Sequence, residues 1–531
     1  MKKILAVLML IFACLWGTAF AADFSHLVIM HTNDTHGYDR RADGVNGMAT
    51  VAALKKDYEA KGYDVLLVDA GDAIQDNNLV NFSKGKTAID FMNAVGYDAM
   101  TLGNHEFDYG SDVTQARIKQ AKFPIMSANI IVEATGKSFT PKTHAIVKKG
   151  GLKIGIFGLT TPSTVTTSNP KSTRGLTFLS KDAMYQAAQK EVDALKAAEC
   201  DLIVAIGHLG SEPDAAGDRS NDILENVKGI DVFIDGHDHT VKDLYINNAL
   251  LTETGAHLAN IGAVLYKNGK WTEDLHAYGR FNQEDARVKA MVDKAQADID
   301  KQLSAVVGKT DMELNGSRDP GVRTEETNLG DFLADAYLWQ VRHATVLERV
   351  TIDGALLNGG SIRSGIAAGD ITQNDLLRVL PYHNHLQYIT MKGATLLEVF
   401  EAATCTTPKA IGAFPQVAGI TYTVDTTKPF EKGELYPHST YYSPAKPGTR
   451  VTITSVGGKP FDPNATYNIA VPDYLTSGGD TYYSLTDPGK VTIHDVDYLD
   501  VDAVRNYLHE ELGDHVGAAY AQPQGRITII Q

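Results

Sequence analysis

Cysteine is scarce in this chain of 531 residues, which contains only three, at positions 14, 200 and 405. So few cysteines exclude a disulfide framework and a zinc site built from four thiolates. Cys200 and Cys405 fall in parts of the chain that we assign below to different domains, so we expect two buried thiols rather than a disulfide. Any metal site must therefore use histidine, carboxylate and amide ligands.

An excess of basic residues is also missing. The formal net charge is −16, with 49 Lys and Arg against 65 Asp and Glu, and no basic stripe stands out. Such a chain repels nucleic acid polymers and anionic membrane surfaces. If the substrate is an anion, we expect bound metal ions to hold it.

Long apolar runs are absent except at the N-terminus. A charged start at Lys2 and Lys3, apolar residues 4–16 and an Ala-x-Ala site ending at Ala21 predict a signal peptide over the first 21 residues. The protein is therefore expected to be periplasmic or secreted, with no membrane segment after cleavage and a net charge of −18. A lipoprotein attached at Cys14 is the alternative.

Short apolar runs alternate with amphipathic segments up to about residue 254. The alternation predicts an α/β domain with a largely parallel or mixed sheet, and no period of a solenoid repeat occurs. Helices are expected at Met48–Ala60 and Lys181–Ala198. Because the apolar runs are β-branched or aliphatic and bounded by turn residues, we expect buried strands at Leu27–Met30, Val65–Val68, Ile154–Phe157, Leu202–Ile206 and Val232–Ile234.

Residues 283–306 are helix formers of alternating charge with only a thin apolar stripe. This pattern predicts a helix that joins two bodies, which places one domain at 22–282 and a second α/β domain at 307–531. In the second domain we expect helices at Thr327–Val341 and Ile371–Leu380, and strands at Ile420–Val424, Val451–Ile453 and Tyr467–Val471.

Five short motifs with metal-binding side chains follow the predicted strands of the first domain. Loops at the carboxyl ends of strands converge in open α/β sheets, so we expect the motifs to meet. Oxygen and imidazole donors without thiolate suit divalent zinc, manganese, iron or cobalt. We expect Asp34/His36 and His237/His239 each to lie on one side of an extended segment. The motifs are Asp34-Thr35-His36, Gly71-Asp72, Gly103-Asn104-His105-Glu106 with Asp108, Gly207-His208 and Gly236-His237-Asp238-His239.

Most of the motifs have an ordinary structural explanation when they are taken alone, and Gly-Asn-His-Glu is far more specific than the others. Asp-x-His and Gly-Asp occur in many turns, and Gly-His-x-His suits a single structural zinc. All five motifs in this order favour a site for two ions. The positive charge of two divalent ions, less the negative charges of Asp34, Asp72 and one hydroxide, leaves about one positive charge to bind a phosphate. Such a site explains how an acidic protein binds an anion.

This order of motifs resembles that of the calcineurin-type metallophosphoesterases. The opening His-Thr-Asn-Asp-Thr-His-Gly at 31–37 and the second half make the chain similar to bacterial 5′-nucleotidases and UDP-sugar hydrolases. The resemblance implies a layered α/β/β/α metallophosphoesterase domain and an α/β substrate-binding domain joined by a helix. It also implies that Asp34, His36 and His239 hold one ion, that Asn104, His208 and His237 hold another, and that Asp72 bridges both.

By the same resemblance His105 is not a ligand. It would stabilise the transition state or the leaving oxygen, with Asp108 orienting its ring. The loop after Asp72 departs from the family pattern, because Ala-Ile-Gln-Asp-Asn-Asn stands where a Gly-Ser is often found. Four further histidines are expected to be bystanders, namely His31, His257, His383 and His385.

Two tyrosines in the second half lie beside glycine-rich loops, where they suit either a slot for a flat polar ring or ordinary core positions. The resemblance favours the slot, with tyrosine at both positions where phenylalanine is common. In the sequence, Arg323 lies near the position where the family has a further arginine. The residues implied to bind substrate are Asn358, Arg363, Tyr382, Tyr474 and Asp480.

We therefore expect an exported hydrolase with two divalent metal ions that converts nucleoside 5′-phosphates to nucleoside and phosphate. Nucleotide sugars are further candidate substrates. One alternative is a 2′,3′-cyclic nucleotide 2′-phosphodiesterase/3′-nucleotidase, and another is a non-catalytic nucleotide-binding scavenging protein. The expected partner is a small nucleotide and not a nucleic acid polymer, and the sequence indicates no oligomeric state.

Overall fold

The computed structural model describes residues 22–212, 215–345, 350–437 and 439–531. The predicted signal peptide and the lipoprotein alternative at Cys14 lie outside the described residues. Over the described ranges, no helix combines the length and the apolar character needed to cross a membrane.

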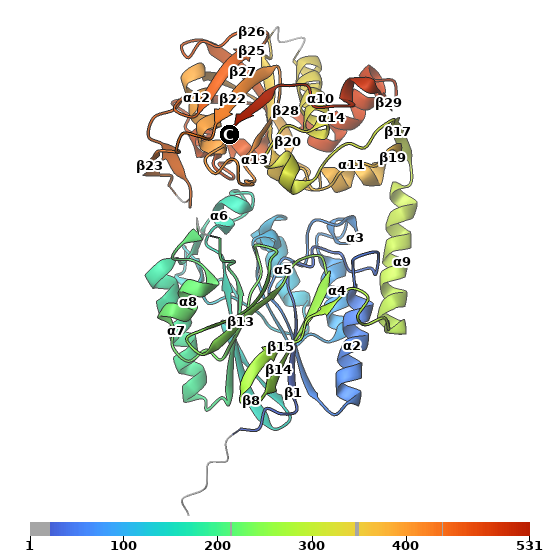
Figure 1. The fold of residues 1–531 in the computed structure, drawn as a ribbon, viewed down its shortest axis with the longest axis vertical. Coiled ribbons are helices and arrows are strands. Elements are labelled where there is room, and N and C mark those ends of the chain that lie inside the picture. The colour runs from blue at the N-terminus through green and yellow to red at the C-terminus, as the bar shows by residue number, and fades with distance from the viewer. Residues whose placement is uncertain (1–21, 213–214, 346–349, 438) are drawn as a thin grey trace, which may run out of the picture.

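Two mixed sheets pack face to face in the first half (Figure 1). Their strand orders are β15-β14-β1-β2-β3-β4, with β16 beside β14, and β12-β13-β11-β10-β8-β7. Neighbours from β1 to β4 are parallel, as are β8, β10, β11 and β13. The strands are β1 (Leu27–Thr32), β2 (Asp64–Asp69), β3 (Ala99–Thr101), β4 (Ile125–Met126), β7 (His144–Lys149), β8 (Leu152–Thr160), β10 (Leu202–His208), β11 (Val232–Ile234), β12 (Val241–Ile246), β13 (Ala249–Thr254), β14 (Asn260–Lys267), β15 (Lys270–Glu273) and β16 (His276–Ala277).

Helices cover the outer faces of both sheets, which gives four layers (Figure 1). Aliphatic side chains such as Ile29, Val68 and Ile206 fill the space between the sheets. Leu54 and Met92 pack on the outer face of the first sheet, and their helices α2 and α4 form one outer layer. The predicted α/β/β/α layering is confirmed. The helices are α2 (Met48–Ala60), α3 (Asn78–Asn81), α4 (Lys86–Val95), α5 (Ser111–Gln120), α6 (Thr164–Thr167), α7 (Lys181–Ala197) and α8 (Ser220–Asn226).

The five predicted strands of the first half correspond to β1, β2, β8, β10 and β11. Most extend beyond the apolar run into polar residues, as β1 does at Thr32 and β10 at His208. The helix predicted at Met48–Ala60 is α2, and the one predicted at Lys181–Ala198 is α7. Four of these strands, β1, β2, β10 and β11, therefore deliver motifs to one end of the two sheets, and the remaining motif follows β3, which the sequence did not predict.

Helix α9 (Ala286–Leu303) runs beside both halves (Figure 1). The Asp285 side chain accepts a hydrogen bond from the backbone N–H of Val288 and caps its start. The thin apolar stripe is divided, because Val288 and Val292 pack in the first core whereas Ile299 and Leu303 pack in the second. We propose the domain boundaries on either side of this helix, at 282/283 and 306/307.

The second half combines a sheet of order β21-β18-β27-β20-β28 with a second sheet, β26-β25-β22-β30. Phe332 of α10 and Phe400 of α12 are fully buried in its two cores. The strands are β17 (Val306–Thr310), β18 (Gly354–Asn358), β19 (Gly369–Thr372), β20 (His385–Lys392), β21 (Pro415–Ala418), β22 (Ile420–Asp425), β25 (Val451–Val456), β26 (Lys459–Pro460), β27 (Thr466–Pro472), β28 (Val491–Leu499), β29 (His515–Val516) and β30 (Ile527–Ile530). The helices are α10 (Asn328–Ala344), α11 (Gln373–Val379), α12 (Gly393–Ala403), α13 (Asp473–Thr476) and α14 (Asp500–Asn506).

Two local predictions need correction. The helix predicted from Ile371 begins at Gln373, because Ile371 pairs with Gly308 in β19 and Thr372 caps the helix. Cys200 and Cys405 are not joined in a disulfide, as predicted, but both side chains are half-buried rather than buried. The reason is that Cys200 follows α7 and Cys405 follows α12, so both lie just beyond a helix end.

Asp39 is a buried carboxyl group in the first half, and its side-chain oxygens have no hydrogen-bond partner among the described residues. Burial raises the pKa of Asp39 from its ordinary value of 3.8 to about 8. The folded state therefore holds a proton that the unfolded chain releases near pH 4. The contribution of this proton to the free energy of unfolding is present below about pH 4. It is lost as the pH rises to about 8, at about 1.4 kcal/mol per pH unit.

We expect Asp39→Asn, which removes this ionisation, to unfold at a higher urea concentration than the unchanged protein at about pH 8. The difference should shrink toward about pH 4, where the carboxyl stays protonated in both states. Asp43→Asn, which removes an exposed carboxylate nearby, is the control. Identical urea midpoints for the Asp39 variant and the unchanged protein at both pH values would contradict the prediction.

Candidate metal and catalytic site

Asp34, His36 and His239 bring three donor atoms to one point. In this group, and in a second made of Asp34, Asp72 and His208, the donor atoms lie within 4.8 Å of one another. The Nε2 atoms of His36 and His239 face each other at 3.2 Å, and His239 Nε2 is 3.4 Å from Asp34 Oδ1. Two imidazoles and a carboxylate so arranged are a donor set that a divalent ion satisfies.

The second group lies beside the first and shares Asp34 with it. His208 Nε2 is 3.1 Å from Asp72 Oδ2 and 3.2 Å from Asn104 Oδ1. The rings of His208 and His237 are 5.1 Å apart. The structure thus brings all seven predicted ligands together, from the carboxyl ends of β1, β2, β3, β10 and β11.

Backbone carbonyls fix the two buried imidazoles with Nε2 toward the acids. Nδ1 of His36 lies 3.2 Å from the carbonyl oxygen of Gln75, and Nδ1 of His208 lies 2.8 Å from that of Ala70. A carbonyl only accepts, so each Nδ1 carries a proton and each Nε2 faces the site. Burial lowers the pKa of His36 well below its ordinary value and that of His237 to about 4. Burial alone would lower the pKa of His208 as well, but the Asp72 and Asp34 carboxylates outweigh it and raise the pKa, so this ring attracts a proton that a cation can replace. The donor set fits divalent metal ions.

The expectation that the paired ligands lie on extended segments is wrong. Asp34 and His36 have φ angles of 48° and 49°, and His237 and His239 have 101° and 58°. Since β1 ends at Thr32 and β11 at Ile234, all four residues are in loops that turn sharply. Left-handed backbone is unfavourable for residues with a Cβ, and such conformations cluster at functional sites.

Glu106 holds the loop of Asp72, although sequence reasoning gave it no role. Its buried carboxylate accepts backbone N–H bonds from Asp72, Ala73 and Gly103, at 2.9, 2.8 and 2.6 Å. A side chain at Gly103 would overlap the Asp72 carboxylate, which explains the glycine. The only signal in the sequence was the acid next to His105.

His105 and Asp108 form a hydrogen-bonded pair, as the family resemblance implies. Nδ1 of His105 is 2.6 Å from Asp108 Oδ2, and its backbone N–H donates to Asp72 Oδ1 at 2.8 Å. Burial alone would lower the pKa of His105, but the Asp108 and Asp72 carboxylates outweigh it and raise the pKa. His105 is therefore suited to donate a proton from Nε2.

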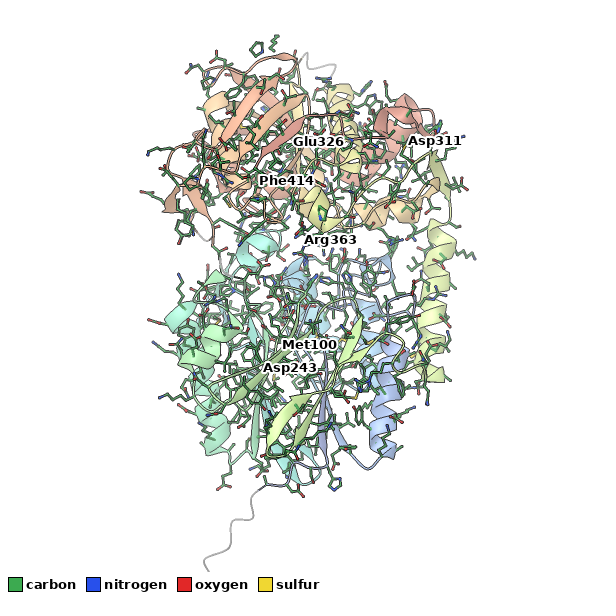
Figure 2. All side chains as sticks on the ribbon, viewed as in Figure 1. Met100, Asp243, Asp311, Glu326, Arg363 and Phe414 are labelled. Carbon is green, nitrogen blue, oxygen red and sulfur yellow. The ribbon has the colours of Figure 1, made fainter. Side chains whose placement is uncertain are left out.

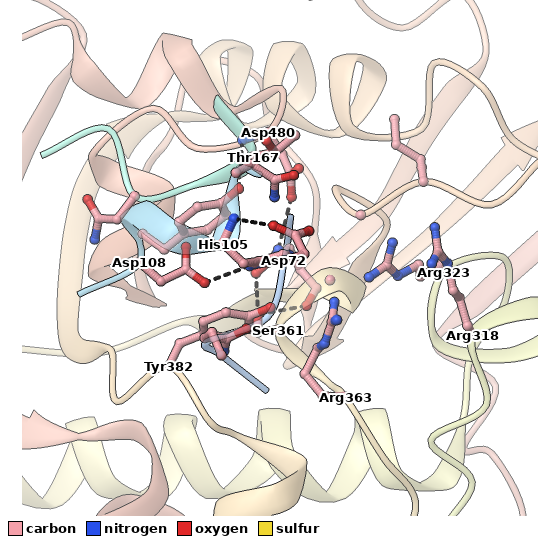
Figure 3. A pocket seen from close by; sticks show the side chains of 18 of the residues that line it. Asp72, His105, Asp108, Thr167, Arg318, Arg323, Ser361, Arg363, Tyr382 and Asp480 are labelled. Carbon is pink, nitrogen blue, oxygen red and sulfur yellow. Dashed lines mark hydrogen bonds and ion pairs between the residues drawn. The ribbon is translucent and has the colours of Figure 1, made fainter. Parts of the chain in front are cut away.

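One pocket joins the two halves, and Figure 3 shows side chains of both lining it. Asp34, His36 and His208 are buried behind its wall. The structure places all five predicted substrate-binding residues in the same pocket. The lining includes Asp72, Asn104, His105, Asp108, His237 and His239 from the first half, and Arg318, Arg323, Asn358, Arg363, Tyr382, Tyr474 and Asp480 from the second.

The second-half wall is aromatic and polar. The Tyr382 ring lies 6.2 Å from the His105 ring at an angle of 24°. Asn358 donates to Asp480 at 3.0 Å, and burial raises the pKa of Asp480 to about 6. Tyr474 lines the pocket near this acid, six residues before it in the sequence. The wall can therefore accept a flat ring and the hydroxyl groups of a sugar.

Arg363 lies at the junction of the two halves (Figure 2). Its guanidinium is 3.2 Å from both carboxylate oxygens of Asp76, which belongs to the loop that departs from the family pattern. Arg318 and Arg323 add two further cations to the pocket, and burial lowers the pKa of Arg323 to about 9. Sequence reasoning noted Arg323 but missed Arg318 and the ion pair of Asp76.

His257 lies closer to the metal donors than its expected bystander role suggests. Its ring stacks on Tyr38 at 4.1 Å and lies 5.6 Å from the His36 ring, and its backbone N–H donates to the Asp34 carbonyl. It is not a member of the two donor groups. His31 is hydrogen-bonded to Glu273 at 2.9 Å, which confirms its structural role.

Comparisons with known proteins agree with this geometry. The model of the calcineurin-like phosphoesterases matches residues 27–241, and that of the 5′-nucleotidase C-terminal domain matches residues 306–487. The chain is 30% identical to the 5′-nucleotidase of Vibrio cholerae, over 94% of this chain and 93% of that protein. It is 31% identical to the trifunctional nucleotide phosphoesterase protein YfkN of Bacillus subtilis over 95% of this chain, which spans only 35% of that protein. The crystal structure of a 5′-nucleotidase precursor from Thermus thermophilus has a TM-score of 0.78 at 27% identity, covering 95% of this chain and 99% of that one.

Proposed function

Because the chain belongs to the 5′-nucleotidase family, whose members hydrolyse phosphoric esters, we propose that it releases phosphate from nucleoside 5′-monophosphates in the pocket between its halves. One observation carries the proposal: four of the seven metal donors line a single cavity together with the aromatic wall. A nucleotide has its phosphate at one end and its base at the other, and this cavity offers groups for each.

The base is proposed to lie against Tyr382 and Tyr474, where stacking on an aromatic ring contributes about 1–3 kcal/mol per base. Asp480, held by Asn358, can accept hydrogen bonds from the ribose hydroxyls. Arg318 and Arg323 offset phosphate charge from the second half.

We propose two divalent ions, one held by Asp34, His36 and His239 and the other by Asn104, His208 and His237. Asp72 would serve both, because its Oδ2 lies 3.9 Å from His36 Nε2 and 3.1 Å from His208 Nε2. When bound, such ions supply an activated water and neutralise phosphoryl charge.

His105 would protonate the departing ester oxygen from Nε2 while Asp108 holds Nδ1 and fixes the ring. The proton leaves His105 as the bond between phosphorus and the ester oxygen breaks. His105 then returns to its charged form by taking a proton from water.

Export is part of the proposal, because the first 21 residues have the charge, apolar run and cleavage site of a signal peptide. Mass spectrometry of the protein recovered from the medium or periplasm should find a mature chain that starts at Ala22. A chain retained in the cytoplasm with Met1 would contradict export.

A substrate panel and metal analysis of the mature protein test the activity. We expect about two divalent ions per chain and phosphate release from AMP, lost on chelation and restored by added metal. UDP-glucose and 2′,3′-cyclic AMP in the same panel test the nucleotide-sugar and cyclic-ester alternatives. Activity on the cyclic ester alone, or no turnover of any ester, would refute the proposed function.

A further inference from the structure

The short helix α6 (Thr164–Thr167) lies directly beneath the second half (Figure 1). It belongs to the first half and follows the end of β8. Thr164 donates its hydroxyl to the Thr161 carbonyl at 2.7 Å, and the backbone N–H of Ser168 donates to the Thr164 carbonyl at 3.2 Å. Thr164, Thr166 and Ser168 are buried. These internal bonds tie residues 161–168 into one compact unit.

The second half contacts this unit at the backbone carbonyl of Thr166. The hydroxyl of Tyr474 donates to the Thr166 carbonyl at 2.7 Å, and the backbone N–H of Asp480 approaches the same oxygen at 2.9 Å. The Asp480 N–H also lies 3.1 Å from the Tyr474 hydroxyl. A phenylalanine at position 474 would keep an aromatic ring but would lose the bond of the hydroxyl.

Two residues further on, the same unit contacts the catalytic pair. The Ser168 hydroxyl is 2.7 Å from Asp108 Oδ1 and 2.5 Å from the Asn104 carbonyl oxygen. The other oxygen of Asp108, Oδ2, is 2.6 Å from His105 Nδ1. The Ser168 hydroxyl shares its one proton between the Asn104 carbonyl and Asp108 Oδ1, so the Asp108 carboxylate has a partner on each oxygen, Ser168 on one and His105 on the other.

We infer that Ser168 is a positioning residue for the His105–Asp108 pair, and that the Tyr474 hydroxyl seats it from the second half through Thr166. The inference rests on the proposed function and deepens it. A carboxylate bound on both oxygens cannot rotate freely, so the imidazole bonded to it keeps one orientation. The contact of Tyr474 with Thr166 is thereby coupled to the orientation of the His105 ring.

The inference has a kinetic signature. Ser168 touches neither the ester nor the base, so its loss should lower kcat and leave KM for AMP nearly unchanged. Tyr474→Phe should lower kcat through the same unit. Because both act on the orientation of His105, the two losses should overlap instead of multiplying.

The test is a double-mutant cycle with Ser168→Ala, Tyr474→Phe and the combined variant, assayed on AMP. We expect Ser168→Ala to lower kcat about tenfold and Tyr474→Phe about threefold, with the combined variant close to Ser168→Ala alone. Ser168→Thr, which restores the hydroxyl, should recover most of the loss. The control is Tyr436→Phe, which removes a buried hydroxyl bonded to Ser484 at 3.0 Å within the second half and should leave kcat unchanged.

Glycerol 2-phosphate separates this inference from the proposed function. Its basic alkoxide leaving group needs the catalytic pair but it carries no nucleoside, so Ser168→Ala should lower its kcat as well. If the unchanged protein hydrolyses it but not AMP, the proposed function fails while the role of Ser168 is still measured. Unchanged kcat in Ser168→Ala, or losses that multiply in the combined variant, would overturn the inference. Should Ser168→Ala not fold, unchanged kcat on AMP in Tyr474→Phe would overturn it.

Discussion

Replacing Asp72 by asparagine is expected to lower kcat for AMP on the order of 10³-fold or more and to reduce the metal content. Its Oδ2 lies 3.1 Å from His208 Nε2, and its Oδ1 accepts the His105 backbone N–H at 2.8 Å. An amide keeps the shape but brings no charge to the ions and turns one acceptor into a donor. The loss should therefore exceed that from any residue that contacts only the nucleoside.

Metal analysis and steady-state kinetics on the same preparation check this prediction. Asp64→Asn is the matched control, because Asp64 begins the strand β2 at the end remote from Asp72. It should retain both metal and activity. An Asp72 variant with a full metal complement and undiminished kcat would remove Asp72 from the proposed site.

The second large effect is expected for His105→Ala, with kcat for AMP about 10²- to 10⁴-fold lower and the metal content unchanged. The His105 side chain is bonded to Asp108 and is not one of the donors, and the backbone N–H that binds Asp72 remains in alanine, so the ligand set stays complete. The loss should depend on the leaving group, because a proton donor matters most where the departing oxygen is strongly basic.

A comparison of AMP with p-nitrophenyl phosphate checks that dependence. The nitrophenolate needs little protonation, so His105→Ala should cost it much less activity than it costs AMP. Asp108→Asn should resemble a milder form of the same change, since the ring remains but loses its partner. Equal losses on both esters, or depleted metal, would exclude the proton-donor role.

The sequence predicted β1, β2, β10 and β11 of the first half because each is an apolar run followed within a few residues by candidate donors, whereas it missed β3, which is only three residues long. Leu202–Ile206 extends as β10 to His208, and Val232–Ile234 is the strand β11 before His237. A buried parallel strand has a strong apolar signature, and the place where loops converge follows from the sheet. The second half gave a weaker pattern because many of its strand pairs are antiparallel and strands such as β22 and β25 alternate buried with more exposed residues.

What the sequence could not predict depends on pairs that are distant along the chain. Asp76 meets Arg363, and Thr166 meets Tyr474, only after the halves come together. The left-handed backbone of Asp34 and His239 is likewise invisible, because an aspartate or histidine in a strand-to-loop turn has no compositional mark of its φ angle. Glu106 was overlooked because it binds backbone N–H groups, which any sequence offers.

The division of α9 between two cores limits how the chain can be taken apart. Val288 and Val292 complete one interior, and Ile299 and Leu303 complete the other. If the chain were divided on either side of α9, one fragment would lack part of its hydrophobic core. The other would carry an exposed apolar stripe. Exchange of halves between related proteins is therefore favourable only where the incoming partner carries matching side chains along that helix. The two halves therefore depend on the same helix for their packing.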